Sequence, residues 1–314
     1  MGQGFPTADR FRELLLGHAH SRSFDVPSCG GVSSSGRPRG CNRPAKRQHQ
    51  GVGQPYLSLE AELHDAFWEA EDDGSEVRLM AEFLKKHPGV ALEMGAGSGR
   101  LMLPLVRMGH EVEGLELSRD MLELGRARAA REGIRAVIHE GDMSSWNPGR
   151  KFSALLAPAF TLQLAEDPAA TLRHWHRLLE NHGGLYLTVF MPYAELLGDL
   201  PENEWYRDHR VTLPDGREGL LETRHRLDRA RQIVHREHRY SISGDEALSH
   251  ASKQDIHWLE HDPLLALLAG CGFHPGKFFV DFDPKRPVTH PDRMDFDGIL
   301  TYHATRADRL PEIS

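Results

Sequence analysis

The sequence predicts an α/β fold in which a parallel sheet carries an inserted block of antiparallel strands. Short apolar segments alternate with helical segments between residues 90 and 190, which is typical of parallel strands joined by helical crossovers. A glycine-rich turn follows the first of these apolar segments. After Pro192 the pattern changes, and Asp215-Gly216 and residues 228–231 resemble hairpin turns. We therefore predict an antiparallel block within an α/β frame.

The N-terminal segment differs in composition from the remainder of the chain. Sixteen of the 35 residues from 21 to 55 are Gly, Pro or Ser. Such a segment buries too little apolar surface to offset the entropy that is lost when it becomes ordered. We predict a disordered extension over residues 1–55, which either has no role or acts as a basic arm or transit peptide. The folded domain is expected over residues 56–314, with residues 193–258 forming an inserted β lid or substrate subdomain.

Charge and cysteine content limit the partners and the compartment. The chain has a formal charge of −8, but residues 1–50 contain eight basic and three acidic side chains, so the body is more acidic still. An acidic body is a poor match for a phosphate backbone, which disfavours a nucleic-acid partner. The three cysteines are far apart, and no apolar run reaches the roughly 20 residues that span a bilayer. No signal-peptide pattern begins the chain. We predict a cytoplasmic protein with no membrane partner.

Two helices are expected before the first strand. Residues 57–86 carry apolar side chains at spacings of three and four. Asp73-Gly74-Ser75 divides this pattern, and Ser75 is a candidate N-cap for the second helix. Aromatic side chains near or within the first helix are expected to close one side of a substrate cleft: Tyr56, Phe67 and Trp68.

The following elements are bounded by Gly, Pro and capping residues. Ser118 is a candidate N-cap, and Asp262-Pro263 opens a late helix. The predicted strands are 90–94, 111–117, 136–139, 152–157, 185–190, 278–282 and 299–303, and the predicted helices are 100–108, 118–131, 168–181 and 264–269.

The most informative segment is the glycine-rich turn after the first predicted strand. Gly95, Gly97 and Gly99 have G-x-G-x-G spacing around Ala96. A ligand must approach this backbone closely, and any Cβ would block it. The N–H groups of the next helix favour an anionic or polar group at the same place. Glu93, near the end of the strand, directs a carboxylate towards this crevice.

Two further acidic residues follow the second and third predicted strands. Glu116 lies 21 residues beyond Gly95, where a carboxylate can bind both hydroxyls of a ribose. Asp142 can accept a hydrogen bond from an adenine amino group, while Leu117 and Met143 offer apolar faces to the ring. The combination predicts a nucleoside site. The alternative is a glycine-rich turn with two unrelated surface acids.

The nucleoside is not predicted to be a dinucleotide, because Arg100 occupies the last position of the G-x-G-x-x-G/A fingerprint. The chain instead resembles the class I S-adenosylmethionine-dependent methyltransferases. The resemblance rests on Glu93-Met-Gly-Ala-Gly-Ser-Gly99 and on residues 114–122, 140–143 and 179–184. It implies a Rossmann-like, seven-stranded, mostly parallel sheet whose last strand is antiparallel.

The same resemblance implies S-adenosyl-L-methionine as cofactor and assigns its contacts. The loop from Gly95 to Gly99 would surround the methionine end. Glu116 would bind the ribose, and Asp142 the adenine amino group. Ala157, at the end of the fourth strand, would approach the amino group and the sulfonium through its backbone.

The acceptor is predicted to be a small molecule. Ala157-Pro-Ala-Phe160 lacks the Asn or Asp and the second proline of the [N/D]-P-P-[Y/F] pattern that accompanies methylation of nucleobase or glutamine amides. Within the superfamily, the amino-sugar N-methyltransferases are the closest resemblance. We therefore expect methyl transfer to an amine or hydroxyl. Tyr193 is the one candidate catalytic residue. We predict no metal site, since His257 and His261 are more simply explained as surface or capping residues.

Two other functions remain open from the sequence. The chain could be a non-catalytic module that binds S-adenosylmethionine and forms a homodimer through the inserted sheet. It could also be a tRNA or rRNA methyltransferase that uses the basic segment from Arg37 to Arg47.

Overall fold

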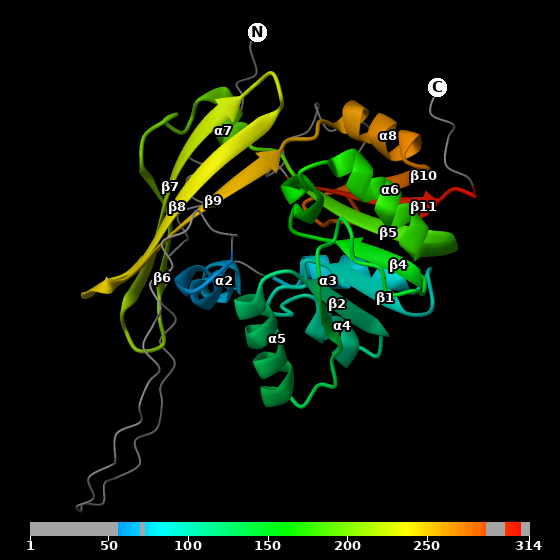
Figure 1. The fold of residues 1–314 in the computed structure, drawn as a ribbon, viewed down its shortest axis with the longest axis horizontal. Helices are drawn as coiled ribbons and strands as arrows, with labels where there is room; N and C mark the ends of the chain where they lie inside the picture. The colour runs from blue at the N-terminus through cyan, green and yellow to red at the C-terminus, as the bar shows by residue number, and fades with distance from the viewer. Residues whose placement is uncertain (1–55, 70–72, 287–298, 309–314) are drawn as a thin grey trace, which may run out of the picture.

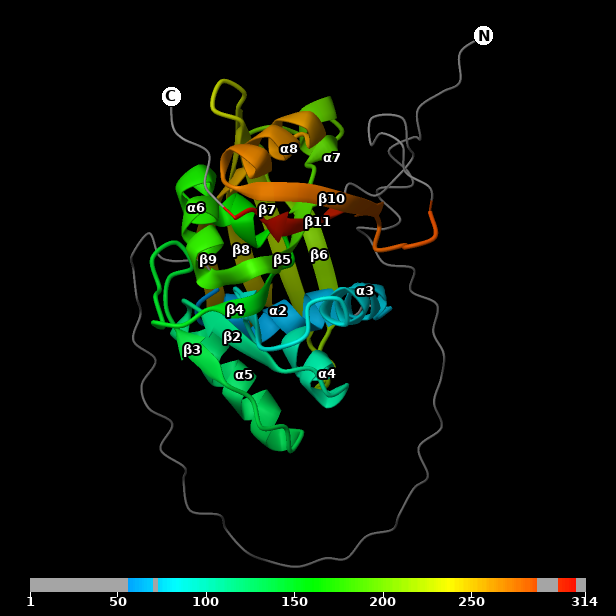
Figure 2. The ribbon, with the colours of Figure 1, turned by 90° about the vertical axis from the view of Figure 1, so that its right-hand side faces the viewer.

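The structure is a computed structural model, and it describes residues 56–69, 73–286 and 299–308. The predicted extension over residues 1–55 lies outside the described residues. Two sheets lie side by side (Figure 1). We call the seven-stranded sheet the core sheet and the four-stranded sheet the inserted sheet. Seen from the core side, the strands of the inserted sheet lie behind the core sheet (Figure 2).

The core sheet has the strand order β10-β11-β5-β4-β1-β2-β3. Strands β1 to β5 pair in parallel with their neighbours, whereas β11 is antiparallel to both β5 and β10. This arrangement confirms the predicted mostly parallel sheet with an antiparallel last strand. The strands are β1 (Ala91–Met94), β2 (Val112–Glu116), β3 (Ile138–Glu140), β4 (Phe152–Ala157), β5 (Leu179–Phe190), β10 (Phe273–Val280) and β11 (Ile299–Arg306).

Helices cover both faces of the core sheet because successive side chains of a strand point to opposite sides. Leu92 and Met94 of β1 belong to one apolar cluster with Trp175 of α6 and Leu264 of α8. Ala91 of the same strand belongs to a second cluster, formed with α3, α4 and α5. The helices are α3 (Ser75–Leu84), α4 (Met102–Arg107), α5 (Arg119–Arg131), α6 (Pro168–Leu178) and α8 (His261–Gly270).

Local capping explains where several of these helices begin. Ser118 caps α5 as predicted, since its hydroxyl accepts a hydrogen bond from the N–H of Met121 at 3.2 Å. The predicted cap at Ser75 is wrong, because α3 begins at Ser75 itself. The N-cap residue is Gly74, and the carboxylate of Asp73 accepts a hydrogen bond from the Ser75 N–H at 2.8 Å.

The inserted sheet is antiparallel, with the strand order β6-β7-β8-β9. It confirms the predicted antiparallel insertion. One strand, β9, was not among the predicted elements because its sequence has few apolar residues to reveal an alternation. Its backbone pairs with β8 instead. The strands are β6 (Tyr206–Thr212), β7 (Glu218–Asp228), β8 (Ile233–Ile242) and β9 (Asp245–His257).

Two apolar clusters hold the inserted sheet against the remainder of the molecule. At one end, the first helix, α2 (Leu59–Glu69), packs Leu59, Leu63 and Phe67 against Leu221 and Ile242. At the other end, Leu227, Val234, Ile256 and Trp258 pack with Met191, and partly buried side chains from η1 (Thr161–Leu164) and α7 (Tyr193–Leu197) contact them. The face of the inserted sheet that turns towards the core sheet is therefore buried at both ends. Within the described ranges, no helix has the length and apolar character needed to cross a membrane.

Candidate functional site

The predicted site residues meet at the carboxyl edge of the core sheet. Glu93 of β1 pairs in register with Gly114 of β2 and with Leu156 of β4, so these three strands are direct neighbours. Glu116 is the last residue of β2, and Ala157 is the last residue of β4. In open α/β sheets, the crevice outside this edge is where ligands bind.

The glycine-rich loop has a backbone that favours glycine. Gly95, Gly97 and Gly99 have φ values of 66°, 56° and 80°. A Cβ on Gly97 would lie 3.1 Å from the terminal carbon of Met121. Left-handed backbone costs other residues energy even where space is available. Gly95 is exposed and Gly97 is half-buried, whereas Gly99 is buried. A ligand can therefore approach the backbone closely at the first two glycines.

Glu116 ties the end of β2 to this loop. One carboxylate oxygen accepts a hydrogen bond from the Gly97 N–H at 2.8 Å, and the other accepts from the Ser118 N–H at 2.6 Å. Burial raises the pKa of Glu116, while these backbone N–H groups oppose that rise. A carboxylate has about four lone-pair sites, so Glu116 retains capacity for two hydroxyl donors.

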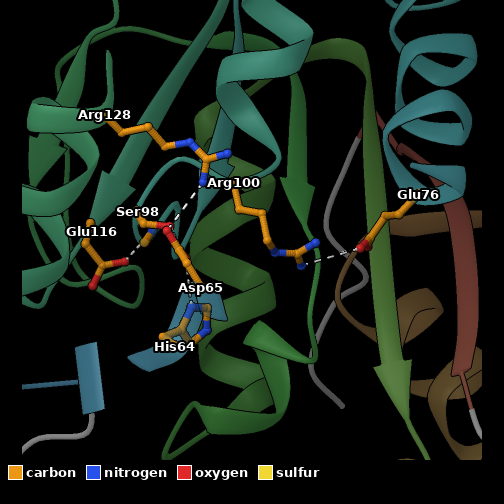
Figure 3. A network of polar contacts seen from close by, with 8 residues as sticks. His64, Asp65, Glu76, Ser98, Arg100, Glu116 and Arg128 are labelled. Carbon is orange, nitrogen blue, oxygen red and sulfur yellow. Dashed lines mark hydrogen bonds and ion pairs between the residues drawn. The ribbon is translucent and has the colours of Figure 1, made fainter. Parts of the chain in front are cut away.

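Glu93 lies on the side of β1 that faces α3 and α4. It is buried, and its Oε2 atom has no hydrogen-bond partner among the described residues. Burial raises the pKa of Glu93 well above its usual range; Glu76 adds to this rise and Arg100 opposes it. Arg100 and Glu76 form an ion pair at 4.0 Å beside it (Figure 3). Glu93 is therefore a buried carboxyl group that can still take a hydrogen-bond donor.

The remaining predicted contacts differ in exposure. Asp142 is exposed, and its Oδ1 atom accepts from the Ser144 N–H at 2.8 Å. Leu117 is 49% exposed, which is unusual for a large apolar side chain beside a polar loop. Met143 is partly buried against the core cluster. Ala96 and Ala157 are buried, so they would contribute mainly through their backbone.

Helix α2 is fastened to the glycine-rich loop by a residue that sequence analysis missed. Asp65 accepts a hydrogen bond from the Ser98 hydroxyl at 2.5 Å and forms an ion pair with Arg128 of α5 at 3.3 Å (Figure 3). Burial acts to raise the pKa of Asp65. Hydrogen bonds from His64 and Ser98 and the charge of Arg128 outweigh it and lower the pKa. The first helix thus lies over the loop that would hold a nucleoside.

The segment before α2 links this edge to the inserted sheet. The backbone C=O of Tyr56 accepts from the Ser118 hydroxyl at 2.6 Å, and its N–H donates to Glu60 at 2.7 Å. The Tyr56 phenol interacts with Gln254 of β9, and burial followed by the charge of Glu60 raises its pKa. Tyr56, predicted to close the cleft, therefore connects the neighbourhood of Glu116 with β9.

The inner face of the inserted sheet carries five buried polar side chains and the partly buried Arg236 between its two apolar ends. We call the following six residues the polar strip: Thr223, His225, Arg236, His238, Ser252 and Gln254. They lie side by side because the strands pair Thr223 with His238 and His238 with Ser252, and likewise His225 with Arg236 and Arg236 with Gln254.

Arg236 joins the polar strip to the carboxyl end of β5. Its guanidinium lies 5.4 Å from the centre of the Phe190 ring and forms a buried ion pair with Glu195 of α7. Burial acts to lower the pKa of Arg236, but the charge of Glu195 raises it overall. The fixed positive charge is therefore balanced inside the protein.

Sequence analysis missed the polar strip, although a pattern could have revealed it. Thr223 and His225 occupy alternate positions between Leu221 and Leu227, in phase with the apolar side chains of β7. Polar residues in the apolar phase of a strand must be buried, and buried polar groups need partners. Such positions point to a polar network or to a ligand.

Tyr193, the predicted catalytic candidate, begins α7. It is half-buried and packs against both the core cluster and the cluster at the far end of the inserted sheet. Its backbone N–H donates to the Met191 C=O at 2.8 Å. The structure thus places Tyr193 between the core sheet and the inserted sheet.

The two histidines considered as metal ligands have other contacts. The expected surface or capping role is wrong for His261, which is buried as the first residue of α8 and is hydrogen-bonded through Nδ1 to the Tyr302 hydroxyl at 2.8 Å. His257 is half-buried at the end of β9, and its backbone C=O accepts a hydrogen bond from Gln163. In the part of the chain that the structure describes, no three His, Cys, Asp or Glu side chains are grouped so that they could hold a metal ion.

Comparison with known proteins identifies the type of domain. Residues 91–183 match the family described as "Methyltransferase domain". A curated relative is the dTDP-3-amino-3,6-dideoxy-alpha-D-glucopyranose N,N-dimethyltransferase of Streptomyces fradiae, which is 36% identical over 100 residues. That match covers 30% of this chain and 38% of the relative, so the chain spans well under two thirds of its length.

Solved structures share the fold over most of the chain. An S-adenosylmethionine-dependent methyltransferase from Clostridium acetobutylicum has a TM-score of 0.64 at 13% identity, covering 79% of this chain and 97% of that protein. A sugar N-methyltransferase from Streptoalloteichus has a TM-score of 0.62 at 19% identity, covering 86% of this chain and all of that protein. These likenesses confirm the predicted fold, and the family match shows a methyltransferase domain over residues 91–183.

Proposed function

We propose that this chain, whose residues 91–183 are a methyltransferase domain, transfers a methyl group from S-adenosyl-L-methionine to an amine or hydroxyl of a small molecule. One observation carries the proposal. Glu116 is buried at the end of β2 and holds the Gly97 N–H of a loop whose three glycines all have positive φ. This contact supports a nucleoside site at the carboxyl edge of the core sheet, and the polar strip is the second polar surface that the proposal uses.

The residues at the edge fit the cofactor in shape and in charge. The loop leaves its backbone accessible at Gly95 and, in part, at Gly97, and the unpartnered oxygen of Glu93 suits an ammonium group. Glu116 has spare lone pairs for the ribose hydroxyls, and Asp142, two residues after the end of β3, would accept a hydrogen bond from the adenine amino group. Leu117 and Met143 would cover the ring, and Ala96 and Ala157 would contribute their backbone.

The cofactor supplies a methyl group on a sulfonium, which is a cation. An edge that gathers acidic side chains lowers the energy of such a cation. Transfer itself depends mainly on holding the acceptor in line with the methyl group. In this chain α2 covers the loop through Asp65 and Ser98, and the inserted sheet covers the acceptor side.

The acceptor is proposed to be an amino sugar or a molecule of similar polarity. The curated relative from Streptomyces fradiae acts on a dTDP-linked amino sugar according to its name. The polar strip offers hydroxyl, amide, imidazole and guanidinium groups, which suit a small polar molecule. We propose that residues 193–258 act as the substrate subdomain, and that Tyr193 lies beside the acceptor.

Titration calorimetry with S-adenosyl-L-methionine tests the cofactor half of the proposal. We expect binding to the wild-type chain and loss of binding in Gly97→Arg. Gly109→Arg is a matched control, because Gly109 also has positive φ but has open space around it. No binding by the wild type, or equal binding by Gly97→Arg, would contradict the proposal.

The rival functions predict different results. A non-catalytic module would bind the cofactor but methylate no member of a panel of amines, amino sugars and phenols. An RNA methyltransferase would bind RNA in a salt-dependent manner, and deletion of residues 1–50 would abolish that binding. The homodimer through the inserted sheet remains a prediction, which sedimentation of the full chain tests.

A further inference from the structure

Several side chains of the polar strip have a buried polar atom without a hydrogen-bond partner among the described residues, and His225 is the one in which two such atoms lack a partner. His225 of β7 is 1% exposed, and neither of its ring nitrogens has a hydrogen-bond partner among the described residues. An unsatisfied buried polar group costs roughly 1–3 kcal/mol. A group of this kind in a native protein calls for an explanation, and a ligand that completes its hydrogen bonds is one.

The surroundings of His225 lead directly to the candidate site. Its register partner is Arg236, which lies over Phe190 at the end of β5. The register partner of Arg236 is Gln254, which interacts with the Tyr56 phenol. The Tyr56 backbone in turn accepts a hydrogen bond from Ser118, next to Glu116. Two cross-strand pairings thus connect His225 to Gln254. Gln254 contacts Tyr56, whose backbone reaches the edge of the sheet near Glu116.

Burial, rather than the surrounding charges, favours the uncharged form of His225. Burial lowers the pKa of His225 below its usual value. The charge of Glu195 on α7 opposes this, Arg236 on β8 adds to it, and Glu202 opposes it more weakly. From β6, the Tyr206 ring contacts the imidazole edge-on at 5.9 Å between ring centres. One ring nitrogen therefore keeps a free lone pair, and the other carries a proton.

The other titratable side chains of the neighbourhood are already engaged. His238 is hydrogen-bonded to the Thr223 hydroxyl at 2.9 Å, and burial lowers its pKa to about 4. Glu195 is held by Arg236. Glu60 accepts from the Tyr240 hydroxyl at 3.1 Å and from the Tyr56 N–H. His225 differs from them because both of its nitrogens remain available.

We propose that His225 contacts the methyl acceptor and takes the proton that the acceptor loses on methylation. This inference rests on the proposed function. The acceptor nitrogen forms a bond to the methyl carbon as the carbon–sulfur bond breaks, and that electron pair stays on sulfur. The methylated nitrogen, now positively charged, gives its proton to the free lone pair of His225. A hydroxyl acceptor would lose its proton to the same nitrogen as its oxygen attacks.

Arg236 would orient the acceptor for this proton transfer. Its Nε atom has no partner among the described residues, although the guanidinium is bound to Glu195. An N–H donor beside His225 would fix an oxygen next to the reacting group. Because Glu195 already balances the charge of Arg236, a neutral oxygen fits this position better than a phosphate. The acceptor class that follows is an amine with a neighbouring hydroxyl.

The experiment compares the wild type with His225→Gln, using the full chain, S-adenosyl-L-methionine and a panel of amino sugars and amino alcohols. Methylated product is detected by its mass. We expect kcat to fall at least about 100-fold in His225→Gln, with a much smaller change in KM and with unchanged cofactor affinity. His235→Gln is the matched control, because His235 pairs with Asp255 away from the polar strip. This control should behave as the wild type.

Three further readouts separate a chemical role from a structural one. At saturating acceptor, the fall in kcat at low pH should be present in the wild type and absent from His225→Gln, because kcat reports the groups of the enzyme–acceptor complex. Added imidazole should restore part of the activity of His225→Ala. In the free protein, the His225 proton resonance, identified by its absence from His225→Gln, should titrate below about pH 6.5.

The possible failures are distinguishable. If the wild type methylates an acceptor and His225→Gln does so equally well, this inference is wrong and the proposed function stands. The same holds if His225→Gln retains the acid limb of the pH profile, or if the His225 resonance titrates above about pH 7. If the wild type methylates nothing on the panel, the proposed function fails, and this inference fails with it.

Discussion

The Glu116 carboxylate accepts a hydrogen bond from the backbone N–H of Gly97 at 2.8 Å, across 19 residues of sequence. This contact joins the end of β2 to the glycine-rich loop after β1. It fixes the loop with its backbone exposed at the edge of the sheet. Sequence analysis assigned the loop containing Gly97 to the methionine end of the cofactor and Glu116 to its ribose. This hydrogen bond joins the two directly.

Glu116→Gln should weaken the binding of S-adenosyl-L-methionine by roughly 10- to 100-fold, because a hydrogen bond to a charged group contributes about 1.5–3 kcal/mol. Titration calorimetry measures the change. Glu140→Gln is the matched control, since Glu140 pairs in register with Glu116 but is exposed and bound to Arg119. Equal affinities for Glu116→Gln and the wild type would show that Glu116 does not contact the ribose.

Gly97→Ala and Gly109→Ala should both destabilise the fold, by roughly 1–2 kcal/mol each, since both positions have positive φ. Only Gly97→Ala should also lose cofactor affinity, because its Cβ would press on Met121 within the candidate site. Urea unfolding measures the first effect, and calorimetry the second. Loss of affinity in both variants would indicate that general destabilisation is the cause.

The buried pair of Arg236 and Glu195 gives a prediction about stability. Arg236→Met leaves the Glu195 carboxylate buried without its cation, which should lower the free energy of unfolding by roughly 3–5 kcal/mol. The double variant Arg236→Met/Glu195→Gln removes both charges and should recover most of this loss. A double variant that is no more stable than Arg236→Met alone would contradict this account. Denaturant unfolding of the full chain measures all three proteins.

His238 makes stability depend on pH. Burial, followed by the charge of Arg236, lowers the pKa of His238 to about 4 in the folded protein, against 6.5 when it is unperturbed. The unfolded chain therefore binds the proton first as the pH falls. The contribution of uncharged His238 to the free energy of unfolding is complete above about pH 6.5 and is lost as the pH falls towards 4.

Between about pH 7 and about pH 5, the free energy of unfolding of the wild type should fall by roughly 2 kcal/mol more than that of His238→Gln. Urea unfolding at the two pH values gives the comparison. His235→Gln, on the same strand, should retain the pH dependence of the wild type. An equal slope in His238→Gln and in the wild type would show that another group is responsible.

Much of the fold could be predicted because its elements have strong local patterns. The strand around Leu92 is apolar except for Glu93, Ser118 caps α5, and the spacing of Gly95, Gly97 and Gly99 marks the turn between a strand and a helix. Strand β9 was missed because few of its residues are apolar. Its position depends on backbone pairing with β8, which local pattern does not encode.

The candidate site likewise contains residues that sequence can locate and residues that only the folded structure brings together. The positions of Glu93, Glu116 and Asp142 follow from strand ends, which sequence can locate. The contact between Arg236 and Glu195 spans 41 residues and depends on the register of β7 with β8 and on the position of α7. His225 becomes conspicuous only once that register shows that its nitrogens lack partners. Long-range pairing of this kind is a property of the folded structure.

The central claim is that this chain transfers methyl groups to a small polar amine or hydroxyl. The most direct test incubates the full chain with S-adenosyl-L-methionine carrying an isotopically labelled methyl group and with a panel of amino sugars and amino alcohols. We predict a product whose mass exceeds that of the acceptor by one labelled methyl group in place of a hydrogen. The wild type should form this product, and Gly97→Arg should not. Cofactor binding by the wild type without label transfer to any acceptor would contradict it.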